Sequence, residues 1–339
     1  MNFREIAAKA GVSVATISRV INQPNSVLPE TREKVLCVMK EVGYNVNSAK
    51  GGNVVPVNGI AVIVPSAIKT EYNSFIQGII SVTSRRNFRV SVFYSNGEIE
   101  TERQLIHDIL NYKYKGGIFM ETNLSNGDAH ELHLKSFPFV LAQCAAGNTK
   151  ENVCCINVGE GAYLLTKHLL ELKYKHIMLM AEEDSAFVGI SEGCKRAAEE
   201  AKVGINRMSL EKGENGFKGG MKCAKRIVDM PKEKRPDAVL CPNDLFAIGM
   251  LRMFESQKIQ VPGDIAVASL RDNELGEVAS VELTRIICPF NRLGMMSARM
   301  LFDLFEDEQE DIPQEVVLQP KLEIGKSCGN DRDIVAEFL

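Results

Sequence analysis

The chain has 339 residues, of which 45% are hydrophobic and 25% charged, as expected for a folded protein of two or three compact units. Its longest apolar runs are strand-sized, well short of the roughly 18 residues that a membrane-spanning helix needs, and the N-terminus lacks a signal-peptide pattern. These features favour a cytoplasmic protein with no membrane partner. Nine cysteines without a repeating spacing predict reduced thiols, no bound metal and no cofactor.

The formal net charge is −4, but the charge is unevenly distributed along the chain. Residues 1–50 hold seven basic and four acidic side chains, a net charge of +3, which leaves −7 for the remainder. Positive charge at one end of an acidic chain directs contact with phosphates to that end.

The first 45 residues predict a head of three helices. Apolar residues at helical spacing predict the first helix at residues 3–10, and Gly11 supplies a turn in which a positive φ costs little. Ser13 can cap a second helix that continues to Asn22. A third helix begins at Pro29. This order is typical of a helix-turn-helix, whose second helix enters a DNA groove.

A polar, glycine-containing linker follows the head, and from Gly59 strands alternate with helices. This alternation predicts parallel sheets covered by helices on both faces. Two successive sets of alternating strands and helices, similar in size, predict two lobes that face a cleft. A ligand is expected beyond the carboxyl ends of the strands. The expected strands are 60–64, 89–94, 117–120, 139–142, 176–180, 238–241 and 265–269, and the expected helices are 72–85, 100–112, 161–172, 192–203, 219–229 and 245–255.

No pattern of catalytic residues can be found in this part of the chain. The strand ends carry no glycine-rich phosphate loop, and there is no Walker pattern and no Ser/His/Asp nucleophile arrangement. His130 and His133 have no evident third ligand and indicate a surface helix rather than a metal site. We therefore expect that the protein is not an enzyme.

The chain resembles the lactose/galactose-repressor family of bacterial transcription factors. The resemblance is carried by AGVSVATISRVIN (residues 10–22), PETREKV (29–35), GY (43–44), GIAVIVP (59–65), PND (242–244), VPGDI (261–265) and LTRI (283–286). A helix-turn-helix alone occurs by chance, whereas this combination in this order does not. The resemblance implies a helix-turn-helix head and an α/β core like that of periplasmic binding proteins, with two Rossmann-like lobes.

The resemblance also divides the chain. Residues 1–45 would form the DNA-binding head and residues 46–58 a hinge. The first lobe would comprise 59–157 with 288–318, and the second lobe 158–287 with 319–339.

Positions that match the family's recognition helix are expected to contact DNA. Val14 and Ala15 would face base edges, and Arg19 would reach a guanine or a phosphate. Alternatively, Val14 packs in the small core and its neighbours are ordinary exposed residues. The other residues assigned to this interface are Ser13, Thr16, Ser18, Asn22 and Tyr44, and the last four suit phosphate oxygens.

The hinge departs from the family's pattern. Val46 replaces the usual proline, and Gly51 and Gly52 lie where arginine and leucine are expected. Each glycine costs a helix about 1 kcal/mol relative to alanine. The hinge helix is therefore expected to be weak or absent, without a side chain that wedges the minor groove.

The effector pocket departs from the pattern as well. Ile190 lies where the family has an arginine, and Arg271 lies where it has an aspartate. This change predicts an anionic or mixed ligand, or no ligand, with a sugar, a nucleoside and a phosphorylated metabolite as candidates. The residues assigned to the effector are Tyr72, Ile190, Asn243, Arg271, Cys288 and Phe290.

Together, these features predict a sequence-specific DNA-binding transcriptional regulator, most simply a repressor, controlled by a small molecule in the cleft between the lobes. The family implies a homodimer on pseudo-palindromic double-stranded DNA, formed through helices near residues 72–85 and 244–254. The alternative is a cytoplasmic small-molecule sensor with little or no operator-specific repression, which the head opposes.

Overall fold

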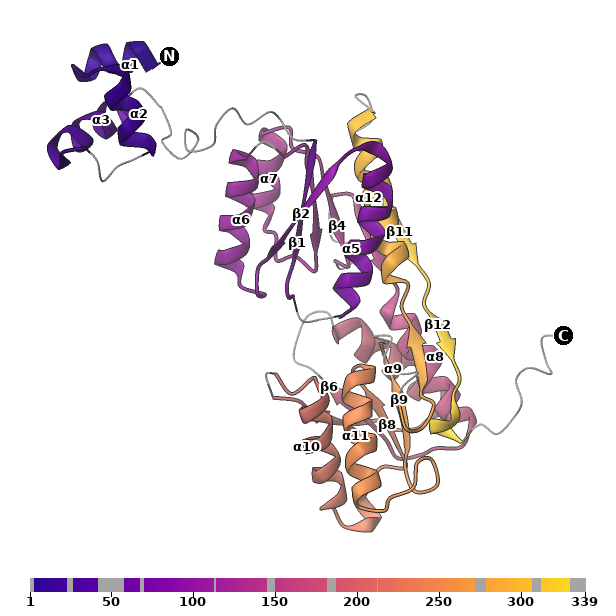
Figure 1. The fold of residues 1–339 in the computed structure, drawn as a ribbon. Coiled ribbons are helices and arrows are strands. Elements are labelled where there is room, and N and C mark those ends of the chain that lie inside the picture. Colours follow the sequence, from indigo (N-terminus) through magenta and orange to yellow (C-terminus); the bar gives the residue numbers. More distant parts are fainter. Residues whose placement is uncertain are drawn as a thin grey trace. The chain divides into compact units, whose positions relative to one another are not determined.

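The computed structural model describes residues 3–22, 27–41, 58–67, 70–112, 114–144, 150–181, 187–211, 213–271, 279–306 and 312–329 (Figure 1). The chain forms two compact units, which we call the head (residues 1–57) and the core (residues 58–339). Among the described residues, no helix is long and apolar enough to cross a membrane.

The head contains the three expected helices. These are α1 (Phe3–Ala10), α2 (Val14–Asn22) and α3 (Pro29–Glu41). Gly11 adopts a φ of 65° in the turn before α2, and the Ser13 hydroxyl accepts a hydrogen bond from the Thr16 backbone N–H at 3.1 Å. The helices enclose a small core made of Ile6, Ala7, Ala10, Ile17, Val20, Val35 and Met39.

The core is built on two six-stranded sheets, which confirms the predicted α/β architecture of two lobes. The first sheet has the order β11-β5-β4-β3-β1-β2 and the second has the order β12-β10-β9-β8-β6-β7. Every strand pair is parallel except β10 with β12. The strands are β1 (Gly59–Val64), β2 (Arg89–Tyr94), β3 (Gly116–Met120), β4 (Phe139–Ala142), β5 (Val153–Ile156), β6 (Ile177–Ala181), β7 (Asn206–Ser209), β8 (Ala238–Cys241), β9 (Ala266–Ser269), β10 (Thr284–Ile287), β11 (Glu315–Leu318) and β12 (Lys321–Glu323).

Helices cover both faces of each sheet. They are α5 (Thr70–Thr83), α6 (Ile99–Asn111), α7 (Asn126–Leu134), α8 (Val158–Glu171), α9 (Phe187–Ala201), α10 (Phe217–Val228), α11 (Asp244–Ser256) and α12 (Phe290–Glu306), with short 3-10 turns at Ser84–Arg86, Lys232–Lys234 and Lys326–Cys328. In the first lobe, α5 and α12 lie on one face of the sheet and α6 and α7 on the other (Figure 1). All six residues of β1 are buried, as expected for a parallel strand covered on both faces.

The chain passes between the two sheets after β5, after β10 and after β11. The first passage leads into α8 and the second into α12, which packs on β3, β4 and β5 of the first sheet. Residues at these passages therefore reach both lobes.

Glycines bring pairs of helices into close contact. A Cβ atom at Gly294 of α12 would overlap the Phe75 carbonyl oxygen of α5, and one at Gly78 of α5 would overlap the Asn291 carbonyl oxygen. A Cβ atom at Gly193 of α9 would likewise overlap the Gly159 carbonyl oxygen of α8. The backbones of these helices thus approach more closely than any side chain would allow.

Candidate functional site

Helix α2 separates its residues into an inner and an outer face. Ile17 and Val20 are buried in the core of the head. Val14 is 42% exposed, so it does not fill that core. The exposed residues on the rest of this surface include Ser13, Ala15, Ser18 and Arg19, with Thr16 half-buried beside them.

The outer face of α2 thus holds most of the residues that the sequence assigned to DNA. Asn22 is the last residue of α2, and Tyr44 lies outside the described residues, as does the whole predicted hinge except residue 58. Their assigned contacts and the weak hinge helix remain predictions.

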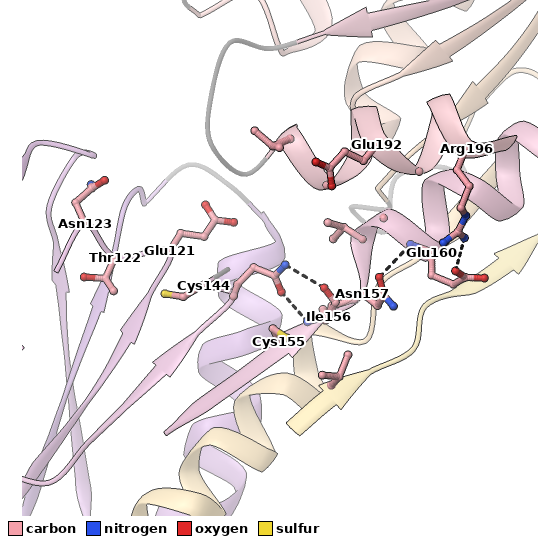
Figure 2. A pocket seen from close by; sticks show the side chains of 17 residues that line it. Glu121, Thr122, Asn123, Cys144, Cys155, Ile156, Asn157, Glu160, Glu192 and Arg196 are labelled. Atoms are coloured by element: carbon pink, nitrogen blue, oxygen red, sulfur yellow. Dashed lines mark hydrogen bonds and ion pairs between the residues drawn. The ribbon is translucent and has the colours of Figure 1, made fainter. Parts of the chain in front are cut away.

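A pocket of about 890 Å³ lies in the core and is lined from both lobes (Figure 2). The first lobe contributes the residues that follow β3 and β4, and the second lobe contributes the start of α8 and one side of α9. The lining residues are Glu121, Thr122, Asn123, Gln143, Cys144, Cys155, Ile156, Asn157, Val158, Gly159, Glu160, Val188, Gly189, Glu192, Gly193, Arg196 and Val317.

Tyr72 of α5 holds the pocket residue Glu121. The Tyr72 hydroxyl donates a hydrogen bond to Glu121 Oε2 at 2.6 Å, and the Tyr72 side chain is only 1% exposed. Burial, with the neighbouring Glu121 carboxylate as the second cause, raises the pKa of Tyr72 far above its ordinary value. The phenol therefore stays protonated and keeps its role as a donor.

Side-chain hydrogen bonds also order the loops around Glu121. Gln143 receives a hydrogen bond from the Ile156 N–H at 2.9 Å and donates one to the Ile156 carbonyl oxygen at 3.3 Å. The buried carboxylate of Glu102 on α6 accepts hydrogen bonds from the Thr122 hydroxyl and, at 3.1 Å, from the Asn123 N–H. Tyr72 and Glu102, neither of which lines the pocket, thus help to hold its first-lobe wall in place.

The second-lobe wall carries an ion pair. Arg196 Nη2 lies 2.6 Å from Glu160 Oε2, and the Arg196 guanidinium lies 3.9 Å from the centre of the Tyr163 ring. The Asn157 side chain accepts a hydrogen bond from the Glu160 N–H at 3.1 Å and so caps α8. Figure 2 shows Arg196 turned towards Glu160.

Two cysteines, Cys144 and Cys155, also line the pocket. Burial raises the pKa of the Cys144 thiol to about 11 and raises that of Cys155 as well. Neutral thiols are poor nucleophiles. All nine cysteines are free in the structure.

The six residues assigned to the effector from the sequence are not among those that line this pocket. Tyr72 reaches it only through Glu121. Ile190 is 1% exposed, and Cys288 and Phe290 are buried in the same hydrophobic cluster.

The other two assigned residues lie at strand ends of the second lobe. Asn243 caps α11 by accepting a hydrogen bond from the Phe246 N–H at 2.9 Å, and it donates one to the Asn215 carbonyl oxygen at 2.8 Å. Arg271 is half-buried just after β9. The segments 182–186 and 272–278, which follow β6 and Arg271, lie outside the described residues, so a direct contact between ligand and these assigned residues remains a prediction.

Several lining residues were absent from the sequence assignment. Glu121 and Thr122 follow a predicted strand, so their position at a strand end was the available signal. Asn157, Glu160, Glu192 and Arg196 lie on α8 and α9, and only the passage of the chain between the lobes brings them to the pocket.

Among the residues that the structure describes, no group of three or more His, Cys, Asp or Glu side chains could hold a metal ion. His133 of the HELH segment lies on α7 and contacts Glu151 Oε2 at 2.9 Å. This surface helix is the one that the sequence indicated.

Comparisons with known proteins agree with the two-unit organisation. Residues 2–47 match the family model described as bacterial regulatory proteins of the lacI family, and residues 166–328 match that of a periplasmic binding protein-like domain. Together the two matches span most of the chain, one in the head and one in the core.

Curated relatives match the chain over almost its full length. Catabolite control protein A of Staphylococcus epidermidis is 26% identical over 324 residues, which cover 94% of this chain and 96% of the relative. The HTH-type transcriptional repressor PurR of Vibrio parahaemolyticus is 28% identical over 312 residues, covering 91% and 93%. Among solved structures, a LacI-family transcriptional regulator from Silicibacter pomeroyi has the same fold, with a TM-score of 0.73 at 23% identity, covering 97% of this chain and 99% of that one.

Proposed function

Since this chain belongs to the LacI family of bacterial transcriptional regulators, we propose that its head binds operator DNA and that a small molecule in the described pocket controls this binding. The family consists of DNA-binding repressors controlled by small-molecule effectors. The observation that carries the proposal for this chain is the exposed face of α2, which holds Val14, Ala15 and Arg19 together.

The chemistry of that face suits the major groove. Val14 and Ala15, at the start of α2, offer methyl groups to a thymine methyl, and Arg19 can donate two hydrogen bonds to guanine O6 and N7. Ser13, Thr16 and Ser18 are short hydroxyl side chains that suit phosphate oxygens. The positive charge of residues 1–50 adds attraction to DNA that does not depend on sequence.

The pocket supports control by a ligand. Its volume of about 890 Å³ lies within the range of small-molecule sites, about 300–1,000 Å³. Because residues of both lobes line it, a ligand would bind better to one arrangement of the lobes than to another. Such a preference is the physical requirement for coupling to DNA binding.

The protein would act as a homodimer on a pseudo-palindromic operator. The exposed apolar side chain of Ile80 on α5 supports the first of the two faces named from the sequence, residues 72–85. Exposed apolar residues on a helix face are common at subunit interfaces.

The proposal is tested by binding of the full-length protein to the DNA upstream of its own gene in a gel-shift assay. The Arg19→Ala variant should lose about tenfold or more in affinity, because one bidentate contact to a base is worth about 1–3 kcal/mol. The matched control is Arg103→Ala, which removes an arginine that pairs with Glu100 on the surface of α6 and should bind as the wild type does.

Unchanged binding by the Arg19→Ala variant would remove Arg19 from the interface. Equal binding to upstream DNA and to a scrambled sequence would contradict the proposed function itself.

A further inference from the structure

We propose that Lys34 on α3 binds a phosphate of the DNA backbone beside the start of α2, and so holds the head on DNA without reading its sequence. This inference rests on the DNA-binding function proposed above. It adds to the interface a residue that the sequence did not assign to DNA, and this residue comes from the third helix of the head rather than the second.

The ammonium group of Lys34 lies over the turn that precedes α2. Its Nζ atom is 3.7 Å from the position that a Cβ atom would take on Gly11. Only Val12 and Ser13 separate Gly11 from Val14, the first residue of α2, and three residue steps span at most about 11 Å. The charge of Lys34 therefore lies beside the end of α2 that the proposed function inserts into the major groove.

The Lys34 ammonium is available to an external anion. Its side chain is exposed. Lys34 makes no ion pair with another described residue, although Glu30 lies one turn earlier on the same helix, at the spacing at which such pairs commonly form. Instead of folding back along α3 to Glu30, the side chain reaches across to the turn at Gly11.

Helix α3 as a whole is not a basic patch. It has three acidic and three basic residues, namely Glu30, Glu33 and Glu41 against Arg32, Lys34 and Lys40. General attraction of this helix to DNA is therefore small, and Lys34 adds one local contact with one phosphate for each head. This count sets the size of the effect that an experiment should find.

The backbone that carries Lys34 is held in place by the small core of the head. The next residue, Val35, is buried in the same cluster as Ile17 of α2. The turn is closed by a hydrogen bond of 3.0 Å from the Val12 N–H to the Ala7 carbonyl oxygen. The distance from α3 to the start of α2 is therefore fixed before DNA arrives, and only the Lys34 side chain loses conformational freedom on binding.

A phosphate suits this ammonium group better than a base edge does. Lysine binds phosphate as a compact point charge on a flexible stem, whereas reading a base takes directed hydrogen bonds. The major groove is about 12 Å wide, so phosphates at its edge flank a helix end that enters it. The hydroxyl groups of Ser13 and Thr16, 2.9 Å apart at the same end of α2, suit phosphate oxygens as well. Lys34 supplies the charge that these hydroxyl groups lack.

The test is the salt dependence of DNA binding by the full-length protein. Affinities are measured from about 50 to 200 mM salt for two labelled duplexes, the DNA upstream of its own gene and a scrambled sequence. Lys34→Gln should weaken binding to both duplexes by the same factor, because a phosphate contact carries no sequence information. Its plot of log affinity against log salt should be less steep by about 0.9 for each bound head. Over this range the variant should thus lose about three- to fourfold less affinity per head than the wild type loses.

Two further variants locate the effect. Lys34→Arg keeps the charge and should keep the slope of the wild type. Lys135→Gln makes the same change of charge at an exposed residue of the core, at the end of α7, and should bind both duplexes as the wild type does. Since Lys34 is exposed, the melting temperature of Lys34→Gln should equal that of the wild type, which separates lost binding from lost folding.

The inference is overturned if Lys34→Gln keeps the slope of the wild type, if it weakens binding to the upstream DNA alone, or if Lys34→Arg loses as much slope as Lys34→Gln. The wild-type data test the proposed function separately. A wild type that prefers its upstream DNA, together with an unchanged Lys34→Gln variant, contradicts only this inference. A wild type that binds both duplexes equally contradicts the proposed function.

Discussion

Two non-glycine residues with left-handed backbone angles shape the first-lobe wall of the pocket. Glu121 has a φ of 46° and Gln143 a φ of 55°, and they follow the neighbouring strands β3 and β4. Such conformations cost roughly 1–3 kcal/mol each and persist where surrounding contacts determine them, commonly at ligand sites. Here those contacts come from Tyr72 and from the backbone of Ile156.

Substitution Tyr72→Phe removes one of these contacts and keeps the aromatic ring. We expect a loss of about 1.5 kcal/mol in the free energy of unfolding, measured by urea denaturation, because Glu121 loses a hydrogen-bond donor. The matched control is Tyr112→Phe, at an exposed tyrosine, which should change stability by less than about 0.5 kcal/mol.

The pH dependence of this difference follows from the pKa of Tyr72, which burial and then Glu121 raise in the folded protein. A raised folded-state pKa gives stability that is fully present below the unfolded pKa of about 10 and is lost as the pH rises beyond it. The difference between wild type and Tyr72→Phe should thus stay constant from about pH 6 to pH 9. A difference that changes across this range would contradict the assigned hydrogen bond.

At this scale the sequence predicted the surface of α2 better than it predicted the pocket. Val14, Ala15 and Arg19 were assigned to the outer surface of this helix and are exposed there, since a short helix on a small core has one buried side. The lining depends on which loop residues from two distant segments meet, and spacing does not carry that information. Ile190 illustrates the difference. Its neighbour Gly189 lines the pocket, whereas the Ile190 side chain is buried in the hydrophobic core.

At the scale of elements, close helix pairs hold each lobe together. The pair α5 and α12 meets through Gly78 and Gly294, each placed against a backbone carbonyl of the other helix. Helices α10 and α11 meet in the same way through Gly220 and Gly249. These glycines serve packing rather than backbone flexibility, since none of them has a positive φ.

Substitution Gly294→Ala is therefore expected to lower the free energy of unfolding by at least about 2 kcal/mol, because the added methyl group forces α12 away from α5. Gly204→Ala is the control, since a Cβ atom there has no neighbour within 4 Å. Both are measured by denaturant unfolding of the full chain. Equal stability of the two variants would show that the helices can separate at little cost.

Most helices and the central strands were predictable because their apolar periodicity is long or continuous. The strands β5, β7, β10, β11 and β12 were not among the predicted elements. They have three or four residues each, too few for a pattern to show. Helix α12 was also missed, although Phe290, Leu293 and Leu301 lie on one buried side at helical spacing.

At the scale of the whole molecule, the sequence resemblance predicted the architecture because its motifs lie in both units and in order. The predicted hinge, with Gly51 and Gly52, lies outside the described residues apart from residue 58, so the weak hinge helix remains a prediction. The domain limits proposed from the sequence also remain predictions. What the structure adds is that both lobes line one pocket.

Assembly is testable at this scale. The wild-type chain of 37.5 kDa should sediment at about twice that mass at micromolar concentration. Ile80→Glu should shift it towards the monomer, because a charge would be buried at the proposed interface. Leu134→Glu places the same charge on exposed α7, across the sheet from α5, and should leave the dimer intact. A monomeric wild type, or an Ile80→Glu variant that dimerises normally, would contradict the assigned face.

We propose that a small molecule bound in the core pocket changes the affinity of the head for operator DNA. The labelled operator is titrated with the full-length protein at one salt concentration, with and without the small molecule that raises the melting temperature of the protein most. We expect at least about a fivefold change in the dissociation constant, the lower end of usual allosteric coupling. The same dissociation constant with and without a saturating concentration of this molecule would contradict control of the head by the pocket.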